Sequence, residues 1–168
     1  NEQTPESIVE AKKLYYEVKA GFTEHYGPSH VQTLTSKMNL ASLLDNEQTP
    51  ESIVEAKKLY YEVIAGETEH YGPSHVETLT SKMNLANLLA KEQTPESIAE
   101  AKKLYYAVIA GRTEHYGPAH VQTLATKGNL AVLLKNEGTP ESVAEAKRLY
   151  YEVVAGETEH YGPTHVQT

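Results

Sequence analysis

Apolar and charged residues follow a helical period over the first 26 residues of the chain. At steps of about 100° per residue, the apolar positions fall on one face and the charged positions fall away from its centre. That face consists of Ile8, Ala11, Leu14, Tyr15, Val18, Phe22 and Tyr26. Thr4-Pro5 is a typical helix start, with Thr as N-cap and Pro at the first helical position, and Gly27-Pro28 is a stop signal. The pattern predicts a helix that begins after Thr4, passes through Gly21 and ends near Tyr26.

A second helical pattern follows the stop signal and runs from about His30 to Asn46. Its apolar side consists of Val31, Leu34, Leu40, Ala41 and Leu44. Neither helix can bury its apolar side alone, so each needs a neighbouring helix to pack against. We therefore expect pairs of antiparallel helices that stack on one another.

The two-helix segment recurs with a period of 45 residues. The units are 1–45, 46–90, 91–135 and an incomplete 136–168. The first two units differ only at Lys19/Ile64, Phe22/Glu67, Gln32/Glu77, Ser42/Asn87 and Asp45/Ala90. Repetition at such a period is typical of α-solenoids. The sequence predicts one all-α solenoid over residues 1–168.

Four short motifs recur in a fixed order. They are Tyr-Gly-Pro-x-His at 26–30, Asn-Leu-Ala at 39–41, Glu-Ala-Lys-Lys-Leu-Tyr at 55–60 and Tyr-Gly at 71–72. Together they resemble the tetratricopeptide repeat (TPR), in the large-repeat form found in kinesin light chain. The resemblance covers the whole chain and implies a TPR-like α-α superhelix. It also implies a concave groove, lined by the first helix of each repeat (helix A), that holds a protein or an extended peptide.

Three lysines depart from the family pattern, which usually has an aliphatic residue at their position on helix A. They are Lys37, Lys82 and Lys127. Their positions lie within the apolar sector of the helix, so we expect each side chain to run along the core and bring its amine out to a polar environment.

A stripe of mainly uncharged polar residues runs along helix A, opposite its core side. Amides and hydroxyls both donate and accept hydrogen bonds, as the main chain of an extended peptide requires. The stripe and its counterparts in later repeats are Gln32, Thr35, Asn39, Ser42, Asn46, Glu77, Thr80, Asn84, Asn87, Lys91, Gln122, Asn129, Val132 and Asn136. These are the candidate residues of a peptide-binding groove, and the resemblance implies that Asn39, Asn84 and Asn129 hold the main chain of the ligand.

Two alternatives stay open for this stripe. The asparagines can instead bridge adjacent helices. Four of the five stripe positions differ between repeats, which fits either tuned specificity or neutral drift.

Charge and composition argue against some classes of binding partner. A net charge of −8 and a pI near 5.5, with Lys and Arg interspersed among Glu, argue against nucleic acid. No apolar run is long enough to span a membrane. The chain has no cysteine and begins at Asn1 without a secretory signal pattern, so we expect a cytoplasmic protein without thiolate metal sites or disulfides.

Histidine pairs are the most suggestive chemical feature. They are His25/His30, His70/His75, His115/His120 and His160/His165. Imidazole pairs can hold zinc, but this spacing crosses a Gly-Pro turn rather than one helical face. We expect a structural role for these histidines, and no metal or cofactor.

Paired tyrosines and regularly spaced glutamates are the other candidates. We expect one ring of each Tyr15-Tyr16 type pair to be buried and the Glu10 and Glu55 positions to be solvated charges. No arrangement typical of an active site stands out, so we expect no enzyme.

The sequence thus favours a non-enzymatic scaffold that binds a protein or extended peptide in the groove of helix A. The alternative is a structural solenoid that associates end to end with other copies. Near-identity of the repeats also fits a designed or consensus repeat protein, or part of a longer array.

Overall fold

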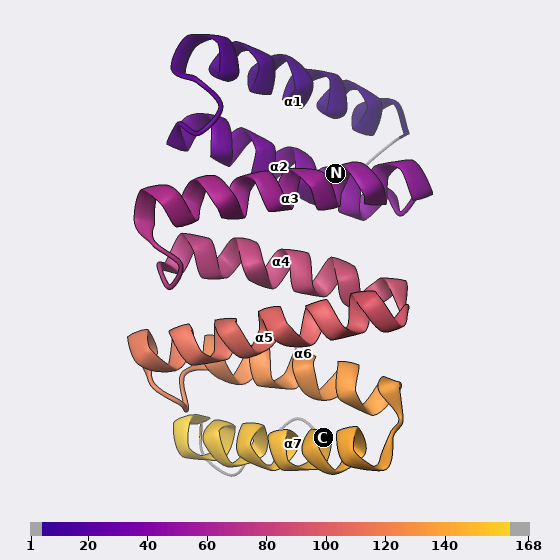
Figure 1. The fold of residues 1–168 in the computed structure, drawn as a ribbon, viewed down its shortest axis with the longest axis vertical. Helices are drawn as coiled ribbons and strands as arrows, with labels where there is room; N and C mark the ends of the chain where they lie inside the picture. Colours follow the sequence, from indigo (N-terminus) through magenta and orange to yellow (C-terminus); the bar gives the residue numbers. More distant parts are fainter. Residues whose placement is uncertain (1–4, 162–168) are drawn as a thin grey trace. The chain divides into compact units, whose positions relative to one another are not determined.

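The computed structural model describes residues 5–161, which form seven α-helices joined by short turns and contain no strand. The helices are α1 (Pro5–Tyr26), α2 (Val31–Glu47), α3 (Pro50–Tyr71), α4 (Val76–Glu92), α5 (Pro95–Tyr116), α6 (Val121–Glu137) and α7 (Pro140–Tyr161). Successive helices run as hairpins (Figure 1). They form two compact units whose boundary, between Asn84 and Leu85, lies within α4. The all-α fold class is confirmed.

The long helices begin where the Thr-Pro signal predicts. Thr49 is the N-cap of α3: its side chain accepts a hydrogen bond from the Ser52 N–H, and Ser52 Oγ accepts one from the Thr49 N–H. Pro50 occupies the first turn, where its missing N–H has no cost. The same capping box recurs at Thr94 of α5. The predicted N-cap Thr4 lies outside the described residues.

The shorter helices begin one residue later than predicted, because His30 is the N-cap of α2 rather than its first residue. His30 has an extended backbone, and its Nδ1 accepts a hydrogen bond from the Gln32 N–H at 3.3 Å. The Tyr26 ring stacks on the His30 ring with centroids 4.6 Å apart. Gly27 between them has a φ of +90°, which favours glycine. His75 and His120 accept equivalent hydrogen bonds at the next two turns.

The core of the first unit lies between α2 and α3, which are packed as a hairpin. Leu34, Leu40 and Leu44 of α2 are buried, as predicted. A close approach between the helices occurs at Gly66, where a Cβ would lie 2.7 Å from Leu34 Cδ2. In the second unit α6 packs on α7 in the same way, and a Cβ on Gly156 would lie 2.8 Å from Leu124 Cδ1.

One expectation about burial, that of Val31, was wrong, and the apolar face of α1 differs from that of α3. Val31, placed on the apolar side of its helix, is exposed at the start of α2. The apolar face of α1 is also largely uncovered: Leu14 is 54% exposed, whereas its counterpart Leu59 on α3 is 4% exposed. The reason is that α2 covers this face of α3, while no described helix lies over the same face of α1.

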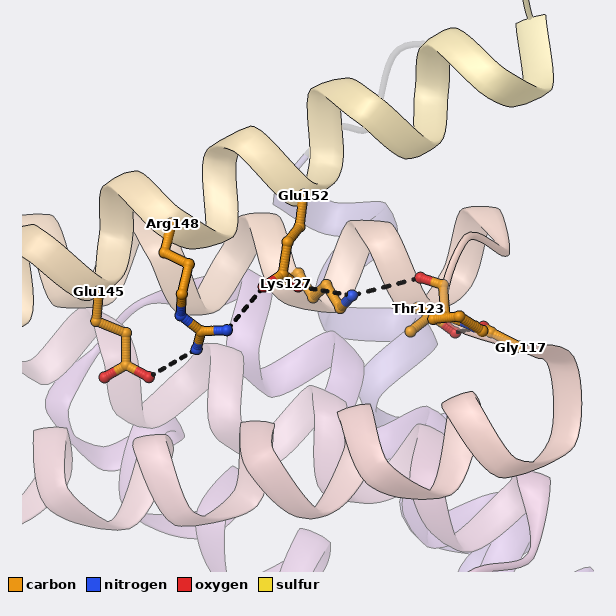
Figure 2. Close-up of polar contacts among 7 residues, drawn as sticks. Gly117, Thr123, Lys127, Glu145, Arg148 and Glu152 are labelled. Atoms are coloured by element: carbon orange, nitrogen blue, oxygen red, sulfur yellow. Dashed lines mark hydrogen bonds and ion pairs between the residues drawn. The ribbon is translucent and has the colours of Figure 1, made fainter.

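The apolar-sector lysines reach polar partners inside the structure. Lys37 and Lys127 are buried. Lys37 Nζ donates to the Pro28 carbonyl at 3.2 Å and forms an ion pair with Glu62 at 2.9 Å. Figure 2 shows the equivalent arrangement at Lys127, whose amine reaches Glu152 at 2.9 Å. Lys37 and Lys127 therefore each tie helix A to the preceding turn and to the following helix.

Candidate functional site

The predicted stripe lies along the surfaces of α2, α4 and α6. Most of its members are exposed: Gln32, Thr35, Asn39, Asn46, Glu77, Thr80, Lys91, Gln122, Asn129, Val132 and Asn136. Ser42, Asn84 and Asn87 are half-buried. The helical spacing thus places these residues on the surface of helix A.

A hollow of about 420 Å³ in the second unit brings five stripe residues together. Its wall includes Asn87, Lys91, Asn129, Val132 and Asn136, from the end of α4 and from α6. The buried Tyr105 of α5 also lines it. The hollow therefore offers amides, one ammonium group and apolar side chains around a tyrosine ring.

Two asparagines of this hollow are hydrogen-bonded to each other. Asn129 Nδ2 donates to Asn87 Oδ1 at 3.1 Å, and the Tyr105 hydroxyl donates to the same oxygen at 2.7 Å. In the first unit, Asn84 Nδ2 reaches Met38 Sδ at 3.5 Å. Asparagines at the 84 and 129 positions thus bridge adjacent A helices, in line with the second interpretation of the stripe.

The first unit has two hollows along the same stripe. One, of about 450 Å³, is lined by Gln32, Thr35 and Asn39 of α2 and by apolar side chains of α1. The other, of about 220 Å³, contains Thr35 and Glu77 together with Glu67 of α3. Four of the eight predicted stripe residues of this unit therefore line a hollow, and no single hollow contains all four.

Glu67 is a lining residue that the sequence analysis did not identify. It is only 8% exposed, and its Oε2 accepts a hydrogen bond from Ser81 Oγ at 2.5 Å. Burial raises the pKa of this carboxyl, and the Ser81 hydrogen bond opposes that shift. A buried carboxylate needs a polar partner, which Ser81 supplies here. Glu67 therefore adds one acidic side chain to the lining of the hollow.

The position of Glu67 differs chemically from repeat to repeat. Phe22 occupies it on α1 and lines the larger hollow of that unit. On α5 it is Arg112, whose Nη1 donates to Thr126 Oγ1 at 2.8 Å, and burial lowers the pKa of this guanidinium. The signal for this position was present in the sequence, since Phe, Glu and Arg replace one another here in otherwise near-identical repeats.

Two of the glutamates that we expected to be solvated, Glu55 and Glu145, are hydrogen-bonded to tyrosines, whereas Glu10 is exposed as expected. The Tyr16 hydroxyl donates a hydrogen bond to Glu55 Oε2 at 2.6 Å. Burial is the larger cause and this hydrogen bond the second cause of a Tyr16 pKa raised to about 12. Burial and a hydrogen bond to Glu145 raise the pKa of Tyr106 to about 12 as well. Figure 2 shows Arg148 between Glu145 and Glu152 on α7. These carboxylates connect successive long helices rather than forming a reactive pair.

Of the predicted histidines, His30 and His120 are the N-caps of α2 and α6. Over residues 5–161 no group of three or more His, Cys, Asp or Glu side chains is placed to hold a metal ion. In the same part of the chain, no helix is both long and apolar enough to cross a membrane.

Neither a protein-family model nor a curated protein sequence matches the chain. Solved structures do match it. A Podosopora anserina protein of the kinesin light chain kind, with nearly identical TPR-like repeats, superposes with a TM-score of 0.81 at 24% identity, covering 95% of this chain and 72% of that one. A variant of the same protein gives the same score and identity, covering 95% of this chain and 71% of its own. BtubC (BKLC) from P. vanneervenii gives a TM-score of 0.71 at 20% identity, covering 96% of this chain and 61% of that one. The chain therefore has the fold of the TPR-like, kinesin-light-chain-type repeat proteins.

Proposed function

We propose that the chain is a non-catalytic scaffold that holds an extended polypeptide segment along the stripe of helix A. The observation that carries this proposal is the hollow of the second unit, where five stripe residues from two A helices surround about 420 Å³. A TPR-like repeat fold supports a protein-interaction role in general.

The chemistry of the hollow suits a peptide main chain. Asn129 uses one amide hydrogen on Asn87 and is otherwise exposed, so its remaining donor and its carbonyl are available to a ligand. Val132 is half exposed beside it and offers an apolar contact for a ligand side chain. The Tyr105 hydroxyl holds the Asn87 amide in one orientation by its hydrogen bond, which keeps the hydrogen-bonding groups of this hollow preorganised.

The test starts from a displayed library of random short peptides selected on the chain. A selected peptide is then titrated, with affinity measured by fluorescence anisotropy, against the chain and its Asn129→Ala variant. We expect the substitution to weaken binding about tenfold or more, because it removes two main-chain hydrogen bonds to the ligand.

The matched control is Lys103→Ala, which removes an exposed polar side chain of α5 that does not line the hollow. It should leave the affinity of a peptide bound in the second unit unchanged. Equal affinity for Asn129→Ala and the parent chain, with both still helical by circular dichroism, would refute the assigned role of Asn129.

A second candidate function is association between copies of the chain through α7. Tyr151 on α7 is 77% exposed, and Val154 on the same helix is also exposed. Contact of these residues with α1 of a second copy would give the end-to-end association that the sequence analysis left open. Sedimentation velocity over a wide concentration range tests this: a mass that does not change with concentration excludes it.

A further inference from the structure

The smaller hollow of the first unit combines aliphatic and acidic side chains. It has a volume of about 220 Å³ and is lined by residues of α2, α3 and the first turn of α4. Val31 and Leu34 contribute aliphatic carbons, and Glu67 and Glu77 contribute carboxyl groups. A side chain that matches this lining has an apolar stem and a cationic end, which is the chemistry of lysine and arginine.

Glu67 has one carboxyl oxygen that the protein does not use. The side chain is 8% exposed, and its Oε2 accepts a hydrogen bond from Ser81 Oγ at 2.5 Å. Within residues 5–161 its other oxygen, Oε1, accepts no hydrogen bond and forms no ion pair, although every fully buried polar side-chain atom there has a partner. Oε1 is therefore open to the hollow that Glu67 lines.

Glu77 and Thr35 supply further acceptors to this hollow. Glu77 is exposed, and its negative charge adds to the larger effect of burial in raising the pKa of Glu67. Two carboxylates that repel each other both gain from a cation placed near them. The Thr35 hydroxyl donates to the Val31 carbonyl at 2.9 Å, so its oxygen remains able to accept a hydrogen bond from a ligand.

The repeat fold does not require acidic residues at these two positions. In the second unit the counterpart of Glu67 is Arg112, and the counterpart of Glu77 is Gln122. Arg112 Nη1 donates to the Gln122 carbonyl at 3.0 Å, so this unit accommodates a cation where the first unit has a carboxylate. A charge that packing does not demand is free to set which ligand is preferred.

From these observations we propose that the hollow lined by Glu67, Glu77, Thr35, Val31 and Leu34 binds a lysine or arginine side chain of an extended polypeptide on helix A of the first unit. This inference rests on the proposed function, because it names a side chain of the same class of ligand. The stem of the side chain lies against the two aliphatic residues. Its cationic end donates hydrogen bonds to the two carboxylates and to the threonine hydroxyl.

The probes are two displayed libraries of short random peptides whose central residue is fixed as lysine in one and as methionine in the other. Both libraries are selected on the chain and depleted on its variant Glu67→Arg/Glu77→Gln, which has the residues of its own second unit at these positions. We expect the lysine library, and not the methionine library, to yield peptides that prefer the parent chain. Changing the lysine of such a peptide to methionine should lower its affinity about tenfold or more in fluorescence anisotropy.

Single substitutions separate the hollow from the overall charge. Glu77→Gln removes one exposed carboxylate of the hollow and should weaken the lysine peptide about threefold. The matched control Glu69→Gln removes an exposed carboxylate of α3 that does not line the hollow, and it should leave the affinity unchanged. In a double-mutant cycle, the losses from Glu77→Gln and from the lysine-to-methionine change should not be additive. Circular dichroism verifies that every variant remains helical.

Two results overturn the inference. One is a lysine library that yields no peptide with a preference for the parent chain. The other is an equal loss of affinity with Glu77→Gln and with Glu69→Gln. The proposed function is tested separately, by the effect of Asn129→Ala on peptides from an unbiased library. A peptide that depends on Asn129, found while the lysine library fails, would overturn only the present inference and leave the scaffold function standing.

Discussion

The glycines at equivalent positions of α1 and α3 give a prediction in which one substitution has different effects on stability. Gly21 and Gly66 occupy the same position on α1 and α3, inside helices of the same length. Changing glycine to alanine inside a helix is worth about 1 kcal/mol of stability when nothing opposes it. We therefore expect Gly21→Ala to stabilise the chain by about 1 kcal/mol, because its new Cβ meets no atom.

At Gly66 the same Cβ would lie 2.7 and 2.9 Å from the two terminal methyl carbons of Leu34. Leu34 is 2% exposed, so it has little room to move away. Overpacking of a buried site typically costs about 1 to 3 kcal/mol, which offsets or exceeds the gain in helix propensity. Gly66→Ala should therefore range from neutral to about 2 kcal/mol less stable.

The assay is urea unfolding followed by far-ultraviolet circular dichroism, fitted with coupled repeat stabilities because arrays need not unfold in one step. Gly156→Ala is the internal replicate, since Leu124 crowds that position in the second unit. The reasoning is refuted if Gly66→Ala stabilises the chain as much as Gly21→Ala does, or if Gly66→Ala and Gly156→Ala have opposite signs.

Three further predictions concern polar groups. Burial raises the pKa of Glu67, so its carboxylate destabilises the folded chain as pH rises through that pKa. Glu67→Gln should therefore increase the free energy of unfolding near neutral pH, but not below the pKa of an unfolded glutamate, about 4.3. Urea titrations at both pH values test this. His75→Ala removes an N-cap acceptor and should lower stability by about 0.5 to 2 kcal/mol, with His75→Asn restoring it in the same assay. The hydrogen bond from Lys127 lowers the pKa of Glu152, which stabilises the folded chain above the unfolded pKa of glutamate and is lost as pH falls through the lowered value. Lys127→Met should raise the pKa of Glu152 toward that of a free glutamate in an NMR titration, and an unchanged pKa would contradict the assigned pair.

The helix ends were predicted well because the residues that determine them act on the neighbouring backbone. Thr-Pro and Gly-Pro set the helix ends through capping and through backbone restrictions that hold in any context. The first residue of α2 was placed one position early because His is not a usual N-cap, and its capping hydrogen bond depends on the imidazole orientation that stacking on Tyr26 favours.

Burial was harder to predict than helicity. The sequences of α1 and α3 are nearly the same, so any pattern assigns Leu14 and Leu59 to the same environment. Their exposures differ because α2 covers one helix face and not the other, and the sequence of the helix itself contains no information about that.

Spacing alone predicted a stripe on the surface of helix A, and most of its residues are exposed, but its hydrogen bonds were not predictable. The bond from Asn129 to Asn87 depends on the distance between two A helices, which the sequence does not fix. Glu67 was missed because charged residues normally face water, whereas here Ser81 of the next helix supplies a hydrogen bond to the buried carboxylate.

The pairing of Leu34 with Gly66 also affects how a gene that encodes these repeats can change length. Both residues belong to one helix hairpin, and the second unit repeats the pair as Leu124 with Gly156. Unequal crossing-over between repeats that inserts or deletes whole units therefore brings each leucine together with its own glycine. Copy number can change by recombination without any compensating substitution at this contact.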